Sequence, residues 1–204
     1  GRGRADASAR SGWRSPAVQS LRRDPREPGA PSARQAGGGS ALHRLLDVVA
    51  HPAYRQNQLI YWSYAAGDAN AVGTDVARGR LSCQADQCSV SDVQVIFSQN
   101  PKLGTGHHFG SRLVWGRDGN LFVTLGDRGR QDEAQNLGNH LGGVMRITDA
   151  GAIPADNPFV KREGVRPEIF TYGNRNVQGA AIHPQTGDLC NILGSVRVGR
   201  IVSI

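Results

Sequence analysis

Short apolar segments separated by turn residues recur three times in this chain, and this repetition limits the folds that it can adopt. From residue 42 onward the segments are about 4–8 residues long and rich in Val, Ile, Leu and aromatic residues, without the spacing of an amphipathic helix. The turn dipeptides that mark equivalent points of the repeat are 65 and then 67 residues apart; they are His51-Pro52, Gly116-Arg117 and His183-Pro184. Four short strands per repeat are typical of a β-propeller blade, so the sequence predicts an all-β fold.

The repeat predicts about two and a half four-stranded antiparallel blades. The expected strands are 41–50, 59–64, 76–81, 93–97, 112–115, 121–125, 144–148, 168–172 and 179–184, followed by one that begins at Leu189. Because a propeller needs about 4–8 blades to close, we expect the chain to be part of a larger molecule. The outer faces of its first and last blades would then be open. Open apolar faces predict poor solubility or self-association of the chain on its own.

Three regions differ in composition. Lys and Arg outnumber acidic residues by 24 to 17, a formal net charge of +7, but residues 1–41 carry +5 of it through eight Arg and three acidic residues. This Arg/Gly/Ala/Pro-rich segment has few large apolar side chains and is predicted to be disordered. Its arginines lack interleaved aromatic residues that could stack on bases, so we expect no nucleic-acid binding. Residues 42–189 are the predicted partial propeller, and residues 190–204 form a separate C-terminal tail.

The apolar runs and the cysteines exclude several classes of protein. No run approaches 18 apolar residues, so no membrane span is expected, and no signal peptide is visible at the start. The three cysteines are too few for a disulfide scaffold, and their spacing does not suit structural zinc. Cys83 and Cys88 enclose four residues between two predicted outer strands, which is compatible with a disulfide or with two free thiols. Cys190 lies in the tail and is assigned no role.

Three polar loops carry the residues best suited to chemistry. The pair His107-His108 precedes a predicted first strand of a blade, where an imidazole could serve as a general base, although such pairs are most often surface residues. Residues 126–132 are rich in Gly and charge, and their simplest interpretation is a solvated turn with Asp127 paired to an Arg. Arg175 and Asn176 precede the next such strand and offer planar donors for a carboxylate or quinone oxygen. His140 is expected near the channel without an assigned role.

Five motifs occur in this chain in a characteristic order: His108 to Arg112, Asn120 to Arg128, Asn139 to Arg146, Ile153 to Phe159 and Gly173 to Gly179. As an ordered set, they resemble those of a known family, the soluble PQQ-dependent aldose (glucose/sorbosone-type) sugar dehydrogenases. The resemblance covers roughly residues 42–189. It implies a six-bladed propeller with four antiparallel strands per blade, pyrroloquinoline quinone (PQQ) at the mouth of the channel, and a periplasmic or secreted location.

The resemblance also implies roles for individual residues. His108, rather than His107, would take the proton of the sugar's C1 hydroxyl while hydride moves to C5 of the quinone. Arg175 would lie against the quinone carbonyls and stabilise negative charge there, with Asn176 as the neighbouring cofactor contact. Some members have a cofactor-facing Gln at the position of Asp132. Because Gln131 is adjacent, both Gln131 and Asp132 are candidate cofactor-binding residues.

The chain also departs from the family. In the family the cofactor contacts a calcium ion, which acts as a Lewis acid. The segment that binds this calcium would follow Leu189. Residues 190–204 contain no acidic side chain, so no residue is assigned as a metal ligand. We hypothesise that residues 1–41 and 190–204 are out-of-frame translations on either side of a genuine fragment. The intact enzyme would oxidise an aldose and pass the electrons to a separate acceptor. The resemblance leaves open whether the intact enzyme is a homodimer. This chain alone is expected to be inactive.

The alternative is a non-catalytic propeller that serves as a binding or interaction module. In that case the same loops would hold a ligand without chemistry. The joint presence of His108 and Arg175-Asn176 favours the dehydrogenase, because a binding module needs no base beside a pair of quinone-binding donors.

Overall fold

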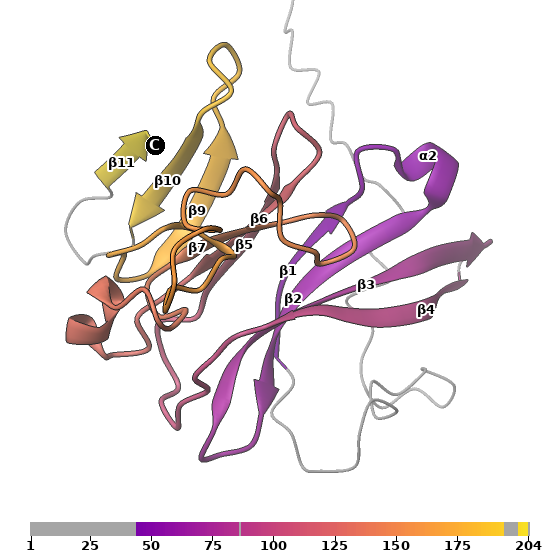
Figure 1. Cartoon of the computed structure of the whole chain (residues 1–204). Coiled ribbons are helices and arrows are strands. Elements are labelled where there is room, and N and C mark those ends of the chain that lie inside the picture. Colours follow the sequence, from indigo (N-terminus) through magenta and orange to yellow (C-terminus); the bar gives the residue numbers. More distant parts are fainter. Residues whose placement is uncertain (1–43, 86, 194–199, 204) are drawn as a thin grey trace, which may run out of the picture.

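The computed structural model describes residues 44–85, 87–193 and 200–203, which form three antiparallel sheets (Figure 1). Within each sheet the strands follow chain order. The first sheet contains β1 (Arg44–Ala50), β2 (Leu59–Gly67), β3 (Val72–Gln84) and β4 (Gln87–Ser98). The second contains β5 (Gly110–Trp115), β6 (Leu121–Leu125), β7 (Val144–Ile147) and β8 (Ile169–Thr171), and the third contains β9 (Val177–Ile182), β10 (Leu189–Leu193) and β11 (Arg200–Ser203).

The predicted all-β fold is confirmed, with two four-stranded sheets and a third sheet of three strands among the described residues. The predicted disordered segment 1–41 lies outside the described residues. Of the predicted tail 190–204, residues 190–193 belong to β10 and residues 200–203 form β11. That segment pairs as strand, since Cys190 lies opposite Ala181 of β9 and Ser203 of β11.

Two single helical turns interrupt the strands and were not predicted from the apolar pattern. They are α2 (Tyr54–Asn57) and the 3-10 turn η2 (Gln131–Gln135). At α2, His51 acts as a turn residue because its Nδ1 atom lies 2.9 Å from the backbone N–H of Ala53, which donates to it. The described part of the chain contains no helix with the length and apolar character needed to cross a membrane.

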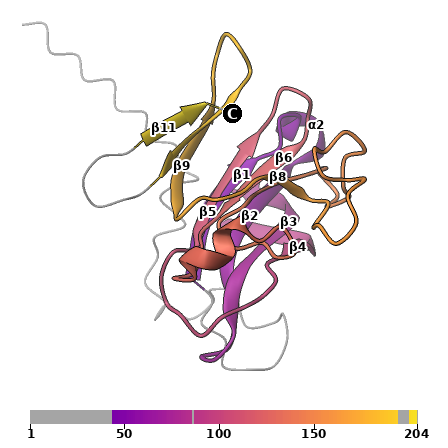
Figure 2. The same cartoon turned by 60° about the vertical axis from the view of Figure 1, so that its left-hand side comes forward.

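The first strands of the three sheets are neighbours in space. β5 contacts both β1 and β9, and Figure 2 shows the sheet of β9 beside the central sheet. Because each sheet starts at this line of contacts and continues outward in chain order, β1, β5 and β9 occupy the innermost positions. This is the arrangement of consecutive blades around the axis of a propeller, so the chain forms part of a β-propeller.

Strand β6 of the central sheet is buried on both faces, which explains why four of its five residues are apolar. All five residues of β6 are buried, and successive side chains of a strand point to opposite faces. Leu121 and Val123 therefore pack into the core shared with the first sheet, whereas Phe122 packs toward the third sheet. In the first core Tyr61 meets Trp115 edge-to-face, with ring centroids 4.9 Å apart. These two apolar layers pack the three sheets against one another.

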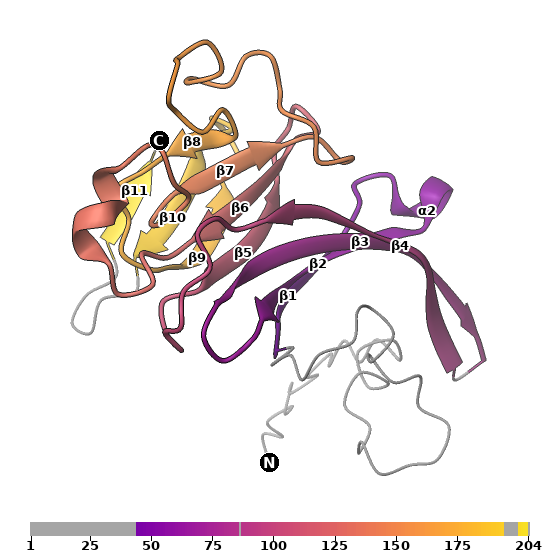
Figure 3. The same cartoon turned by 60° about the horizontal axis from the view of Figure 1, so that its bottom comes forward.

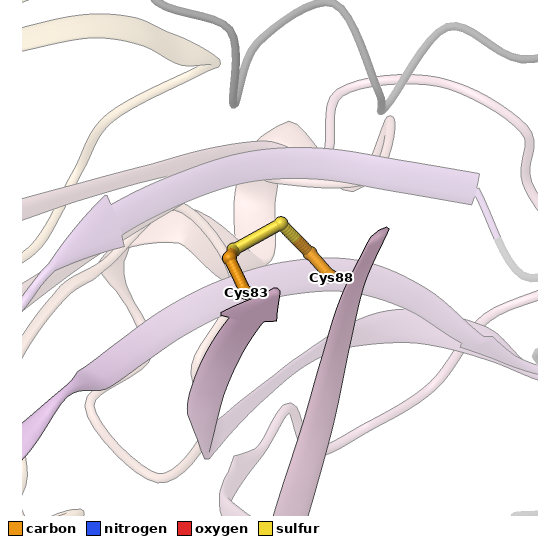
Figure 4. The surroundings of a disulfide bond; sticks show 2 residues. All are labelled: Cys83 and Cys88. Atoms are coloured by element: carbon orange, nitrogen blue, oxygen red, sulfur yellow. A yellow bond between two sulfur atoms is a disulfide. The ribbon is translucent and has the colours of Figure 1, made fainter. Parts of the chain in front are cut away.

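The β3–β4 hairpin is longer than the strands beside it and extends past them (Figure 3). Near its tip Cys83 and Cys88 lie directly opposite each other in the pairing of the two strands and form a disulfide (Figure 4). Of the two possibilities that the sequence left open, the structure therefore shows the disulfide. On the same hairpin Val90, Val93 and Val95 are exposed.

Candidate functional site

The three polar loops singled out in the sequence lie at one edge of the sheets. Because the strands alternate in direction, the connections β4–β5 (99–109), β6–β7 (126–143) and β8–β9 (172–176) all emerge at the same edge. Gly126 pairs with Asn176 in an isolated bridge, and the backbone N–H of Asp127 donates to the carbonyl of Arg175 over 2.8 Å. The structure therefore brings the loop of Arg175 onto the strand end that faces His108.

His108 is held by a buried carboxylate. Its Nδ1 atom lies 2.7 Å from Oδ1 of Asp127, whose side chain is 2% exposed. The same oxygen accepts the backbone N–H of Gly129 over 2.8 Å. A carboxylate only accepts hydrogen bonds, so Nδ1 of His108 carries the proton and Nε2 keeps a free lone pair. The imidazole is thereby fixed in the tautomer that can accept a proton at Nε2.

This geometry corrects part of the interpretation of residues 126–132 as a solvated turn: residues 126–128 are buried, whereas residues 129–132 are exposed. Asp127 pairs with His108 and not with an Arg, and both Asp127 and Arg128 are buried. The sequence could not show this, because the two partners are 19 residues apart and meet only when β5 and β6 pair. A Gly-Asp dipeptide that ends a buried strand, next to a loop with histidines, is the available signal.

Glycine is required where the two loops touch. A Cβ atom on Gly126 would lie 2.0 Å from the carbonyl oxygen of His108, a distance at which real atoms overlap. His108 itself has a φ of 55°, in the left-handed region that few side-chain-bearing residues adopt. The backbone of residue 108 is therefore fitted closely against the end of β6.

Arg175 lines a pocket of about 390 Å³ beside this pair. The lining residues are Asp127, Gln131, Asp132, Ala134, Gln135, Gly173, Asn174 and Arg175. Arg175 is exposed, and among the described residues no side chain or carbonyl pairs with its guanidinium. Gln131 and Asp132, which were predicted as cofactor contacts, belong to η2 and form part of the wall. Asp127 thus links the His108 imidazole to the pocket that contains Arg175.

Asn176 lies next to the pocket but does not line it. It is buried, and its Oδ1 accepts the backbone N–H of Gly110 over 3.0 Å. Asn174, which was not singled out in the sequence, does line the pocket, and its Nδ2 donates to the carbonyl of Gly142. Because the Gly173 to Gly179 segment contains two asparagines around one arginine, only the structure shows which of them borders the pocket.

A second imidazole, which unlike that of His108 is buried, lies outside the pocket. His140 is 3% exposed; its Nδ1 accepts the backbone N–H of Asn100, so Nε2 carries the proton and donates to Glu168 over 2.5 Å. Burial alone would raise the pKa of Glu168, but the hydrogen bond from His140, with a backbone hydrogen bond, lowers it below its ordinary value. His108 and His140 are thus fixed in opposite tautomers.

The described residues do not fit a calcium site. Across residues 44–85, 87–193 and 200–203, no group of three or more His, Cys, Asp or Glu side chains is placed to hold a metal ion. Calcium is bound by six to eight oxygen ligands, so no part of the chemistry is assigned to calcium here.

Consecutive antiparallel sheets whose first strands lie side by side define this protein as part of a β-propeller. The chain belongs to the Glucose / Sorbosone dehydrogenase family, whose family model matches residues 27–192. This finding confirms the resemblance stated for the motifs.

Individual relatives agree with this assignment. The chain is 47% identical over 146 residues to Aldose sugar dehydrogenase YliI of Escherichia coli (strain K12), covering 71% of this chain and 39% of that protein. The solved structure of the soluble aldose sugar dehydrogenase from Escherichia coli in its apo-form superimposes with a TM-score of 0.73 at 44% identity, covering 78% of this chain and 46% of that one. Quinoprotein glucose dehydrogenase B of Acinetobacter calcoaceticus is 33% identical over 96 residues, which are 38% of this chain and 20% of that protein. The chain therefore spans less than half the length of these relatives.

Proposed function

We propose that this chain is the part of a PQQ-dependent sugar dehydrogenase that carries the general base, and that the intact enzyme oxidises the C1 hydroxyl of an aldose. The observation that carries the proposal is the His108–Asp127 pair, joined through Asp127 to the pocket of Arg175. Family membership and the names of the relatives support the class of reaction. A pocket that only binds a ligand would not need a general base beside a pair of quinone-binding donors.

The residues of the pocket suit the oxygens of PQQ, which carries two adjacent quinone carbonyls and three carboxylates. Arg175 presents a guanidinium without a partner among the described residues, and such a group forms bidentate hydrogen bonds to planar oxygen pairs. Gln131 and Gln135 add amide donors to the same wall. When bound, PQQ supplies the acceptor for the hydride of the sugar.

The protein residues would then perform two tasks. Nε2 of His108 accepts the proton of the C1 hydroxyl, and the buried Asp127 carboxylate stabilises the imidazolium that forms. Arg175 donates hydrogen bonds to an oxygen that gains negative charge, as electrostatic stabilisation requires. Asn176 supports this arrangement by holding Gly110 at the start of β5, and a direct contact of Asn176 with the cofactor remains part of the proposal.

Location and partners are proposed from the same relatives. The Cys83–Cys88 disulfide supports an oxidising compartment, such as the periplasm or the extracellular space. Because the chain spans less than half the length of its relatives, three further statements are proposals about the whole protein. The intact enzyme passes electrons to a separate acceptor, it forms a homodimer, and this chain alone shows no turnover.

The test is to measure the binding of PQQ to the full chain by the quenching of its tryptophan fluorescence. Arg175→Ala is expected to weaken binding about tenfold or more, because it removes charge-assisted hydrogen bonds. Arg162→Ala, at an exposed position outside the pocket lining, is the matched control and should leave the affinity unchanged. Equal affinities of the wild-type chain and Arg175→Ala would refute the proposal. PQQ-supported dye reduction by the intact enzyme with a panel of aldoses, lost when His108 of that enzyme is replaced by Ala, would establish the reaction.

A further inference from the structure

Arg128 is a buried cation without a carboxylate partner among the described residues. Its side chain is fully buried on the turn that follows Asp127, and this burial lowers the pKa of Arg128 to about 10. The guanidinium lies over the ring of Phe109, 3.7 Å from the centroid. Burying a charge is costly unless it is well hydrogen-bonded, so its acceptors show what the residue does.

Those acceptors are three backbone carbonyls. Nε of Arg128 donates to His107 over 2.8 Å, Nη1 donates to Val72 over 2.9 Å, and Nη2 donates to Thr105. The hydroxyl of Thr105 donates back to the carbonyl of Arg128 over 2.8 Å. Two of the three carbonyls and the stacked ring belong to residues 105–109, the loop that carries His108, and the third begins β3 of the neighbouring sheet.

The planar fork of Arg128 therefore fixes the loop from inside. Arg presents five N–H donors in a rigid plane, which allows one side chain to hold three carbonyls that point at it from different directions. Its own backbone connects directly to Asp127, the partner of His108. His108 lies on the 105–109 loop, and Asp127 lies on the turn after β6. Arg128 thus connects the segments that carry the imidazole and the carboxylate.

We propose that Arg128 is a positioning residue, which holds residues 105–109 so that Nδ1 of His108 meets Asp127. The inference rests on the proposed function only in treating His108 as the base; the predicted effect on the imidazole does not depend on PQQ or on turnover. A purely structural Arg would change the stability of the chain and leave the tautomer of His108 as it is.

The two histidines with opposite tautomers provide the measurement. In the full chain labelled with ¹⁵N-histidine, the nitrogen chemical shifts report which ring nitrogen carries the proton. In the wild-type chain we expect protonated Nδ1 for His108 and protonated Nε2 for His140. In Arg128→Met the ratio of the Nδ1–H to the Nε2–H form of His108 should fall about tenfold, the size expected for losing one charge-assisted hydrogen bond. His140 should not change and serves as the internal reference.

Arg146→Met is the matched control, because Arg146 is also a buried arginine but pairs with Asp118 and Asp156 beside the β5–β6 turn, at the opposite edge of the sheet. It should leave His108 unchanged. Arg128→Lys keeps the charge but not the planar fork, and should give an intermediate ratio; it decides the matter if Arg128→Met does not fold. An unchanged His108 in the folded Arg128 variants, or an equal change in Arg146→Met, would overturn the inference. Equal PQQ affinities of the wild-type chain and Arg175→Ala would instead refute only the proposed function.

Discussion

The pair of His140 and Glu168 makes the stability of this chain depend on pH in one direction. The hydrogen bond from His140 lowers the pKa of Glu168 in the folded chain below its unfolded value of 4.5. A carboxyl group with a lowered folded pKa contributes stability above its unfolded pKa and loses that contribution as the pH falls through the folded pKa. The contribution of Glu168 should therefore be complete at pH 7 and should be lost as the pH falls below 4.5 and through the lower pKa of the folded chain.

The size of this contribution can be worked out from the contacts. Glu168→Gln keeps an acceptor oxygen for Nε2 of His140 but removes the charge. Hydrogen bonds to charged groups contribute about 1.5–3 kcal/mol and neutral ones about 0.5–1.5 kcal/mol, so this variant should lose about 1 kcal/mol at pH 7. Glu168→Ala leaves Nε2 of His140 unpaired in a site where the imidazole is 3% exposed, and should lose about 3 kcal/mol.

The assay is urea unfolding of the full chain and its variants between pH 3 and pH 8, with tryptophan fluorescence as the probe of unfolding. The difference in the free energy of unfolding between the wild-type chain and Glu168→Gln should narrow as the pH falls below 4.5. Glu163→Gln, at an exposed position, is the control and should show no difference at any pH. A difference that stays constant over the whole range would refute the reasoning, because it would show that the charge of Glu168 is not involved.

Three further predictions concern the disulfide, a buried amide and the exposed face. Replacing Cys83 and Cys88 by Ser should lower the free energy of unfolding by about 2 kcal/mol in the chain-entropy model, measured by urea unfolding; an unchanged midpoint would contradict this. Asn191 is fully buried and neither atom of its amide has a partner among the described residues, so Asn191→Val should raise the free energy of unfolding by about 2 kcal/mol, and a loss of stability would contradict it. Replacing the exposed Val93 and Val95 by Thr should reduce the self-association measured by light scattering; unchanged particle size would show that this face is not involved.

The strands could be predicted because their signal is local. The run at residues 121–125 matches β6 at both ends, since all five of its side chains are buried. The start of β3 was missed, because the sequence suggested residue 76 and the strand begins at Val72. Its first residues include Thr74 and Asp75, which are buried polar side chains. They are satisfied by partners far along the chain, Ser111 and Lys102, and hydrophobic patterning does not detect such pairs.

The sequence indicated which loops carry the candidate residues but not the contacts that those residues make. His108 and Arg175 were identified from motifs, and the loops that carry them do meet at one edge. The role of Asp127 was missed because the carboxylate and the imidazole come together only through strand pairing. Arg128 was missed for a related reason, since its acceptors are backbone carbonyls, which carry no sequence signal.

The length of the β3–β4 hairpin places its disulfide-closed tip far from the chemistry. β3 starts at Val72, whose carbonyl accepts a hydrogen bond from Arg128, and continues for 13 residues, so its far end lies about 40 Å away at the usual rise of a strand. A dye, an affinity handle or a support attached between Cys83 and Cys88 would therefore leave the pocket unobstructed. A chain immobilised through this tip would therefore present the pocket of Arg175 to the solution rather than to the support.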